Sequence, residues 1–204
     1  MGRESHERNI YDFIQTGKEG LALQELEKAG DTLDPNWKNE DDSEMNILAI
    51  ACLKGATEVV RKMLAMPSVD VNQLSEEMSA PLHYACLTRE RKNDCARLLL
   101  LDKRVDVNIR DEDDQTPLWE AAHKGNVELV KLFIALRGED LDFATLDKSE
   151  RPWVVRTETI TQSKGDAKLM SDQADISKII TSFFRHPFPV MVALRNELRI
   201  TVKK

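Results

Sequence analysis

Few residues in this 204-residue sequence have the types and spacing that catalysis or metal binding requires. His83 and Cys86 stand three positions apart, which would place both on one helix face as a metal-binding pair or a cysteine–histidine nucleophile. Cys86, however, fills a position that small residues occupy elsewhere in the chain, and cysteine is among the most frequently buried residue types. We therefore expect His83 and Cys86 to have structural roles.

Two other segments contain residues that could take part in chemistry. His123 lies beside Lys124, but no second acid or base recurs at a spacing that would accompany it. The segment "QTGKEG" (15–20) has two glycines and a lysine, yet the phosphate-loop pattern GxxxxGK is absent from the sequence. The sequence therefore predicts no catalytic, cofactor-binding or metal-binding residues, and we expect a protein that is not an enzyme.

Composition narrows the classes of partner. The formal net charge is −7 and the pI is about 5.2, which argues against binding to nucleic acid or to an anionic membrane surface. No apolar run approaches the roughly 18 residues that a membrane-spanning helix needs, and the charged opening residues do not resemble a secretion signal. The three cysteines form no CxxC pair, which favours a reducing compartment. We expect an intracellular protein, in the cytoplasm or the nucleus.

The elements that would position these residues are copies of one sequence pattern. Three segments align: "NILAIACLKGATEVVRKML" (46–64), "APLHYACLTRERKNDCARLLL" (80–100) and "TPLWEAAHKGNVELVKLF" (116–133). Their leucines at 48, 82 and 118 and a tryptophan at 153 stand 34, 36 and 35 residues apart. A period of this length predicts a repeat protein in which stacked copies bury a common core.

Each copy reads as two short helices. In the third copy, Thr116 is a suitable N-cap and Pro117 suits the first helical position. Gly125 would end the first helix in a left-handed conformation. Apolar residues at 127, 130 and 133 then give the spacing of a second amphipathic helix.

The motifs "TPLWEAAHKG" and "APLHYAC", with "VDVN" at 69–72 and 105–108, resemble the ankyrin repeat. The resemblance implies an all-α, helix-turn-helix solenoid of about five repeats with an irregular C-terminal capping unit. It divides a single repeat domain (1–204) into a degenerate N-terminal capping repeat (8–43), repeats at 44–78, 79–113 and 114–149, and an irregular C-terminal repeat (150–204) with a polar loop and a terminal capping helix. It also implies that Asn72 and Asn108 hold the loops between repeats.

Four positions depart from the family pattern. Glu44, Met78, Asp114 and Ser149 replace the glycine that usually precedes the threonine position. A left-handed backbone costs a residue other than glycine roughly 1 kcal/mol or more. We therefore expect the loops at these four positions to be distorted or mobile.

Ankyrin-type arrays bind proteins through their loops and the concave face of their first helices. Acidic runs at 39–44, 75–77 and 111–114 recur at the period of the repeat, so the resemblance predicts acidic loops on one side. Such a surface would accept lysine and arginine from a partner and speed association; a solvated face with no partner is the alternative. The predicted partner-binding residues are Asp41, Asp42, Glu76, Glu77, Glu112 and Asp113 in the loops and Ile50, Leu53, Tyr84, Leu87, Trp119, Glu120, His123 and Lys124 on the helices.

The preferred interpretation is a monomeric protein-interaction module that binds a protein or peptide with basic groups. The alternative is a structural or adaptor subunit that binds another subunit through its irregular C-terminal unit. Phe183, Phe184 and Phe188 would either anchor such an interaction or cover the open end of the stack. The polar loop at 157–168 contains neither histidine nor cysteine, so it does not indicate an active site.

Overall fold

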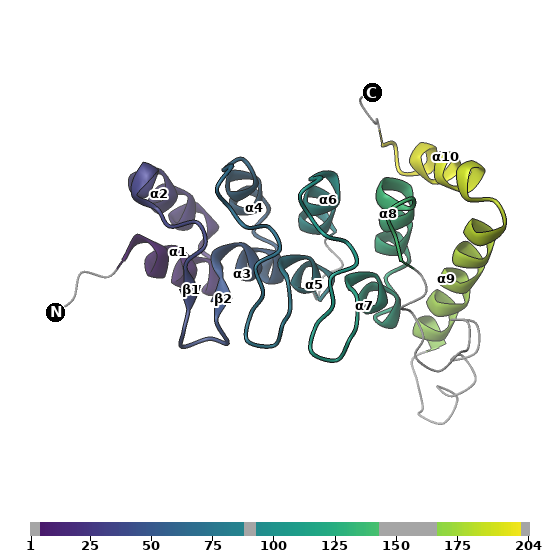
Figure 1. Cartoon of the computed structure of the whole chain (residues 1–204), viewed down its shortest axis with the longest axis horizontal. Coiled ribbons are helices and arrows are strands. Elements are labelled where there is room, and N and C mark those ends of the chain that lie inside the picture. Colours follow the sequence, from purple (N-terminus) through teal and green to yellow (C-terminus); the bar gives the residue numbers. More distant parts are fainter. Residues whose placement is uncertain (1–4, 88–92, 143–166, 201–204) are drawn as a thin grey trace. The chain divides into compact units, whose positions relative to one another are not determined.

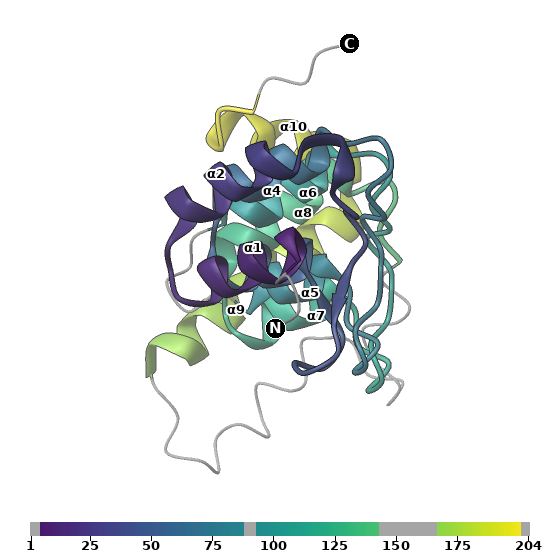
Figure 2. The same ribbon diagram turned by 90° about the vertical axis from the view of Figure 1, so that its left-hand side faces the viewer.

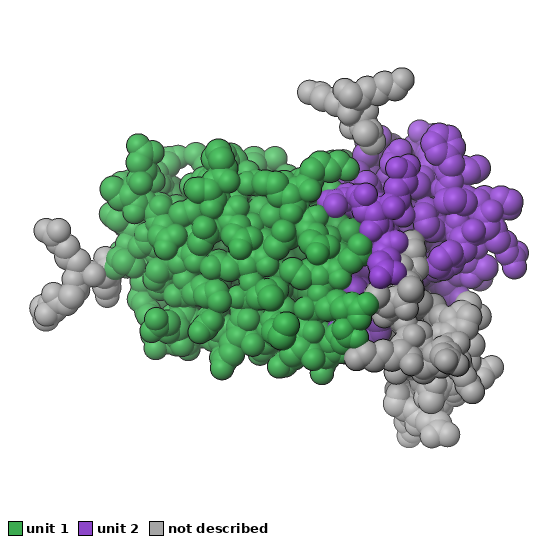
Figure 3. All heavy atoms as spheres, viewed as in Figure 1, with its two compact units in different colours: residues 1–114 green, residues 115–204 purple. Residues whose placement is uncertain are grey.

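A computed structural model describes residues 5–87, 93–142 and 167–200. The chain folds into two compact units, residues 1–114 and 115–204 (Figure 3). Most of the described residues are helical (Figure 1). Unit 1 contains α1 (His6–Gln15), α2 (Glu19–Ala29), the 3-10 turn η1 (Gly30–Thr32), β1 (Lys38–Asn39), β2 (Met45–Asn46), α3 (Ile47–Lys54), α4 (Thr57–Leu64), α5 (Pro81–Cys86) and α6 (Asp94–Leu101).

The helices of unit 1 form two rows (Figures 1 and 2). Helices α1, α3 and α5 contact one another in sequence order, and α2, α4 and α6 do the same in the second row. Leu48 and Leu82 each stand second in the first helix of a pair and are buried, at 0% and 1% exposure. Their equivalent environments confirm the repeated helix pair that the sequence predicts.

A short hairpin is the one departure from an all-helical chain among the described residues. Strands β1 and β2 pair antiparallel, with Lys38 opposite Asn46 and Asn39 opposite Met45. Two residues are too few to produce the alternating pattern by which a strand is recognised in a sequence. The hairpin fixes the base of the first acidic loop.

Three of the residues that replace the family's turn glycine keep the left-handed conformation that glycine would adopt. The φ angles are 51° at Glu44, 53° at Met78 and 61° at Asp114, whereas Ser149 lies outside the described residues. Gly125 has a φ of 65° and follows the first helix of its pair, as predicted. These turns place three loops of unit 1 on the same side of the helices (Figure 2).

Asparagine side chains connect each long loop to the next. The Oδ1 of Asn72 accepts the backbone N–H of Asp106 at 2.8 Å, and its Nδ2 donates to the carbonyl of Arg104 at 2.9 Å. The Oδ1 of Asn36 likewise accepts the N–H of Asp70 at 2.7 Å, and its Nδ2 donates to the carbonyl of Ser68 at 3.0 Å. The predicted role of Asn72 in holding the loops is confirmed, and Asn36 performs the same role one repeat earlier.

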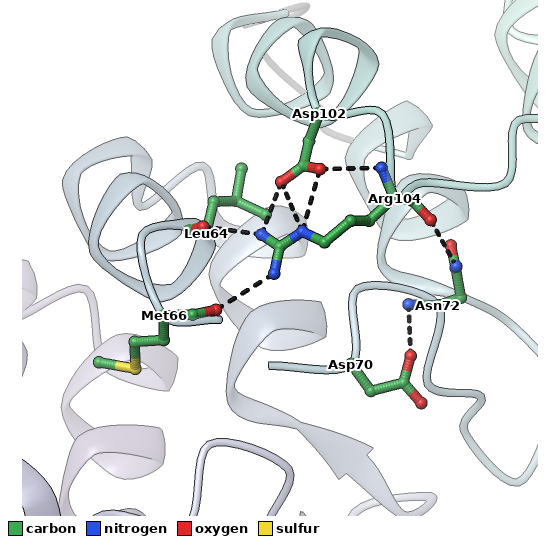
Figure 4. A network of polar contacts seen from close by, with 6 residues as sticks. All are labelled: Leu64, Met66, Asp70, Asn72, Asp102 and Arg104. Atoms are coloured by element: carbon green, nitrogen blue, oxygen red, sulfur yellow. Dashed lines mark hydrogen bonds and ion pairs between the residues drawn. The ribbon is translucent and has the colours of Figure 1, made fainter. Parts of the chain in front are cut away.

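Arg104 joins the same network from the following loop (Figure 4). Its guanidinium donates to the carbonyl of Leu64 at 2.7 Å and to that of Met66 at 3.2 Å, at the C-terminal end of α4. It also forms an ion pair with Asp102, at 2.7 Å. A cation at this position satisfies carbonyls that have no partner within their own helix. Arg104 therefore fastens one repeat to the helix of the preceding repeat.

Unit 2 contains α7 (Pro117–His123), α8 (Val127–Arg137), α9 (Ala167–Arg185) and α10 (Pro187–Glu197). Helix α7 begins as predicted, since the Oγ1 of Thr116 accepts the N–H of Trp119 at 3.3 Å. Leu118 is 2% exposed, as its alignment with Leu48 predicts, whereas Trp153 lies outside the described residues. Most of the polar loop at 157–168 also lies outside them.

Helix α10 packs against both α8 and α9. Lys131 of α8 pairs with Glu197 at 2.7 Å, and the Nε of Arg195 donates to the carbonyl of Ala135 at 2.6 Å. Gly138 follows α8 where a β-carbon would lie 3.1 Å from the ring of Phe183. The same β-carbon would lie 2.5 Å from the carbonyl oxygen of Ile134 and 3.2 Å from the sulfur of Met191, so α8, α9 and α10 pack closely around this glycine.

Candidate functional site

His83 and Cys86 lie inside the helix rows rather than at a surface. They are 1% and 2% exposed, and the Nδ1 of His83 accepts the backbone N–H of Ala80 at 3.1 Å. Burial raises the pKa of the Cys52 thiol well above its ordinary value, and burial likewise raises the pKa of Cys95. Among the described residues, no three acidic, histidine or cysteine side chains are grouped to hold a metal ion.

The acidic runs lie at the tips of three loops of unit 1. The backbone N–H of Glu76 donates to the carbonyl of Ser43 at 2.9 Å, and that of Glu112 donates to the carbonyl of Glu77 at 3.3 Å. These bonds hold the three tips side by side. We call the predicted loop residues Asp41, Asp42, Glu76, Glu77, Glu112 and Asp113 the acidic loop surface.

Two members of the acidic loop surface also bond within the chain. The hydroxyl of Tyr11 donates to the Oδ2 of Asp42 at 2.5 Å, and the Nε2 of Gln15 donates to the same atom at 3.3 Å. Asp41 pairs with Arg8 at 2.8 Å, although the side chain of Asp41 remains 77% exposed. Asp42 therefore positions the first loop against α1 as well as adding charge to it.

The remaining four members are exposed carboxylates. Within the described parts of the chain, the side chains of Glu76, Glu77, Glu112 and Asp113 form no ion pair. Arg110, the basic residue nearest in sequence to Glu112 and Asp113, is paired with Asp114 at 2.7 Å, and Lys38 at the base of the first loop is paired with Glu44 at 3.0 Å. Their negative charge is thus directed to solvent.

Two of the predicted helix contacts must be corrected. The sequence interpretation treats Ile50 and Tyr84 as exposed, but they are 2% and 4% exposed. Ile50 lies in α3, which has α1 on one side and α5 on the other. The ring of Tyr84 points into unit 1, where its hydroxyl donates to the Oγ of Ser75 at 2.9 Å and burial raises its pKa. Leu53 and Leu87 remain half-buried and retain some accessible surface.

The other predicted helix residues belong to unit 2. Trp119 and Glu120 are half-buried, whereas His123 and Lys124 are exposed. The rings of Trp119 and His123 stack with centroids 4.7 Å apart and planes 10° apart. This stack covers one face of the indole, so Trp119 presents less apolar surface than the sequence alone suggests.

Met78 belongs to the middle loop and is absent from the predicted contacts. Its side chain is 49% exposed and directly follows Glu77. The sequence contains one signal for it, a large apolar residue at a turn position that usually holds glycine. An exposed apolar side chain among carboxylates gives the acidic loop surface a hydrophobic centre.

Helix pairs repeated along the chain, with loops held in register, define a tandem-repeat protein. The chain belongs to the ankyrin repeat family: the model for three consecutive ankyrin repeats matches residues 18–111, and the model for a single ankyrin repeat matches residues 113–146. Ankyrin repeats are typically non-catalytic modules that bind proteins. No helix within the described ranges is both long and apolar enough to cross a membrane.

Among the curated proteins that resemble the chain are one from yeast and one from human. One is the probable 26S proteasome regulatory subunit p28 of Saccharomyces cerevisiae, 26% identical over 131 residues, which are 64% of this chain and 54% of that protein. The other is ankyrin repeat domain-containing protein 49 of Homo sapiens, 45% identical over 50 residues, which are 24% of this chain and 20% of that protein. The chain thus spans about half the length of the yeast relative and about a fifth of the human one.

Proposed function

We propose that the chain is a non-enzymatic protein-interaction module whose acidic loop surface binds a partner rich in lysine and arginine. The observation that carries this proposal is the set of exposed carboxylates at Glu76, Glu77, Glu112 and Asp113, on adjacent loops tied by backbone hydrogen bonds. No cation in the described part of the chain neutralises them. A basic partner would supply the missing charge.

The charge distribution supports a basic partner. Unit 1 contains 24 acidic and 15 basic residues, a formal net charge of −9, whereas unit 2 has 12 acidic and 14 basic residues, a net charge of +2. An attractive potential concentrated on one unit raises the rate of association with an oppositely charged partner. Because the carboxylates are exposed, dissolved salt screens them over about 8–10 Å at physiological ionic strength.

Apolar contacts would supply the part of the affinity that salt does not screen. Met78 lies within the acidic loop surface, and the half-buried Leu53 and Leu87 lie in and directly after the first helices of their pairs. In unit 2, Trp119, Glu120, His123 and Lys124 remain proposed contacts on the first helix of that pair. We do not include Ile50 and Tyr84, because both are buried.

Charge reversal provides the test. The double variant Glu76→Lys/Glu77→Lys is compared with Asp31→Lys/Glu139→Lys, which changes the net charge equally at exposed positions away from the loops. Partners are captured from lysate at low and high salt with each variant and with the natural chain. The proposal requires that the loop variant alone loses a basic partner and that high salt weakens its capture. Equal loss with both variants would assign the effect to net charge and refute a specific loop surface.

The second candidate function is an adaptor subunit that binds a larger assembly through unit 2. The exposure of Phe184 and Phe188 favours it, as does the resemblance to a protein named as a probable regulatory subunit of the proteasome. Under this function, removing residues 186–204 would abolish assembly binding and leave the helical content of unit 1 intact. Loss of stability without loss of assembly binding would instead assign those residues to capping.

A further inference from the structure

The corner between α9 and α10 carries apolar side chains that are exposed to a large extent. Phe184 is 61% exposed, Phe188 is 68% exposed and Val192 is 39% exposed. They fall within nine residues of sequence and make up three of the six large hydrophobic side chains exposed in the described part of the chain. The other three, Leu21, Met78 and Leu101, are dispersed over α2, a loop and α6.

These exposed residues are different from the apolar residues that pack between α8, α9 and α10. Phe183 is 6% exposed and its ring lies beside Gly138 at the end of α8. Met191 and Leu194 of α10 are 2% and 6% exposed, on the side of that helix that packs inward. From the sequence, the three phenylalanines could either cover the open end of the stack or bind a partner. In the structure Phe183 is buried, whereas Phe184 and Phe188 are exposed.

Exposed basic residues stand at both ends of α10. Arg185 and His186 are exposed between the two phenylalanines, and Arg199 is exposed just beyond α10. Neither arginine forms an ion pair with any described residue. The acidic residue closest to Arg199 in sequence, Glu197, is paired with Lys131 at 2.7 Å. From residue 174 onward the sequence contains six lysines and arginines and two acidic residues.

We propose that the α9–α10 corner is a second binding surface, which accepts a partner segment that carries carboxylates beside large apolar side chains. Apolar side chains of the partner would cover Phe184, Phe188 and Val192, and its carboxylates would pair with Arg185 and Arg199. Aromatic and arginine side chains contribute most of the binding energy in interfaces of this kind. The surface belongs to unit 2 and is opposite in charge to the acidic loop surface of unit 1.

An anionic membrane is a less suitable occupant for this corner. A helix that lies on a bilayer needs a continuous apolar face directed at the lipid. Met191 and Leu194, which would form that face on α10, are buried against the rest of unit 2.

Selection from a phage-displayed library of random short peptides tests the stated chemistry with a defined probe. The full-length chain serves as bait, and peptides that bind the variant Phe188→Ser/Arg185→Glu are removed. We expect the remaining peptides to combine aspartate or glutamate with leucine, phenylalanine or tryptophan. Affinity for one enriched synthetic peptide should fall on the order of tenfold or more with Phe188→Ser alone, and also with Arg185→Glu alone.

Two controls separate this surface from the fold and from the acidic loops. Circular dichroism should show unchanged helical content, because the Phe188 side chain is mostly exposed. The loop variant Glu76→Lys/Glu77→Lys should bind the enriched peptide as the natural chain does, so failure of the loop proposal and failure of this one are distinguishable. No corner-dependent enrichment, or enrichment of neutral or basic peptides, would overturn the proposal. So would corner-dependent binding of vesicles of phosphatidylserine and phosphatidylcholine, or self-association, in place of peptide binding.

Discussion

Replacing Arg104 by alanine tests whether side chains of one repeat stabilise the helix of the repeat before it. The substitution removes two hydrogen bonds from a charged donor, to the carbonyls of Leu64 and Met66, and the ion pair with Asp102. Hydrogen bonds that involve a charged group contribute about 1.5–3 kcal/mol each when they are buried. The Arg104 side chain is 39% exposed, so water can replace much of what is lost.

We therefore expect Arg104→Ala to lower the free energy of unfolding by about 1–2 kcal/mol. This estimate combines the stabilisation that a cation gives at a helix C-terminus with the contribution of one surface hydrogen bond. For a chain of this size, that loss lowers Tm by about 3–6 °C. Thermal and urea unfolding followed by circular dichroism at 222 nm measure both quantities. Arg104→Lys should recover part of the loss, because it keeps the charge but not the planar group that contacts several acceptors.

Lys103→Ala is the matched control, because Lys103 is the exposed neighbour and forms no ion pair with the described residues. It removes the same charge from the same loop, so it should change the unfolding free energy by less than about 0.5 kcal/mol. If Arg104→Ala and Lys103→Ala destabilise equally, the contacts of Arg104 with α4 do not contribute, and the reasoning fails.

Three further predictions concern the turn, the loop contact and the packed glycine. Met78→Gly should raise the unfolding free energy by up to about 1 kcal/mol by relieving a left-handed conformation, whereas Met78→Ala should not, and urea titrations compare the two. Tyr84→Phe should lower it by about 0.5–1.5 kcal/mol, because the buried hydroxyl bonds to Ser75. The pKa of Tyr84 is raised in the folded state, so its contribution to the unfolding free energy is complete below pH 10 and is lost as the pH rises above that value. The unfolding free energy of Tyr84→Phe should therefore fall less steeply at alkaline pH than that of the natural chain. Gly138→Ala should destabilise unit 2 by about 1–3 kcal/mol, because its β-carbon would lie 2.5 Å from the carbonyl oxygen of Ile134 and would also press on Phe183. Equal melting curves for this variant and the natural chain would contradict the packing.

The sequence predicts the parts of this fold that depend on local spacing. The period places Leu48, Leu82 and Leu118 in equivalent buried positions, and Glu44 and Met78 keep the left-handed backbone of the glycine that the family pattern has at their positions. These features depend on residues a few positions apart, for which the backbone leaves few choices.

Contacts between distant residues were not predictable in the same way. The bond from Arg104 to Leu64 spans 40 residues, and nothing in the sequence around either residue identifies the other. Tyr84 aligns with variable, exposed positions of the family pattern but turns inward because Ser75, on the preceding loop, offers a partner for its hydroxyl. Sequence alone also does not decide which of the adjacent Phe183 and Phe184 faces the core, since either side of an irregular helix could do so.

The backbone bonds that tie the loop tips of unit 1 affect how selective the acidic loop surface can be. Ser43, Glu76, Glu77 and Glu112 are held in place before any ligand arrives, so a partner does not have to order three separate loops. A preorganised surface of this kind loses little conformational entropy on binding. It also limits how far the loops can shift to suit an ill-matched ligand, so basic partners should be discriminated by the spacing of their lysines and arginines as well as by their total charge.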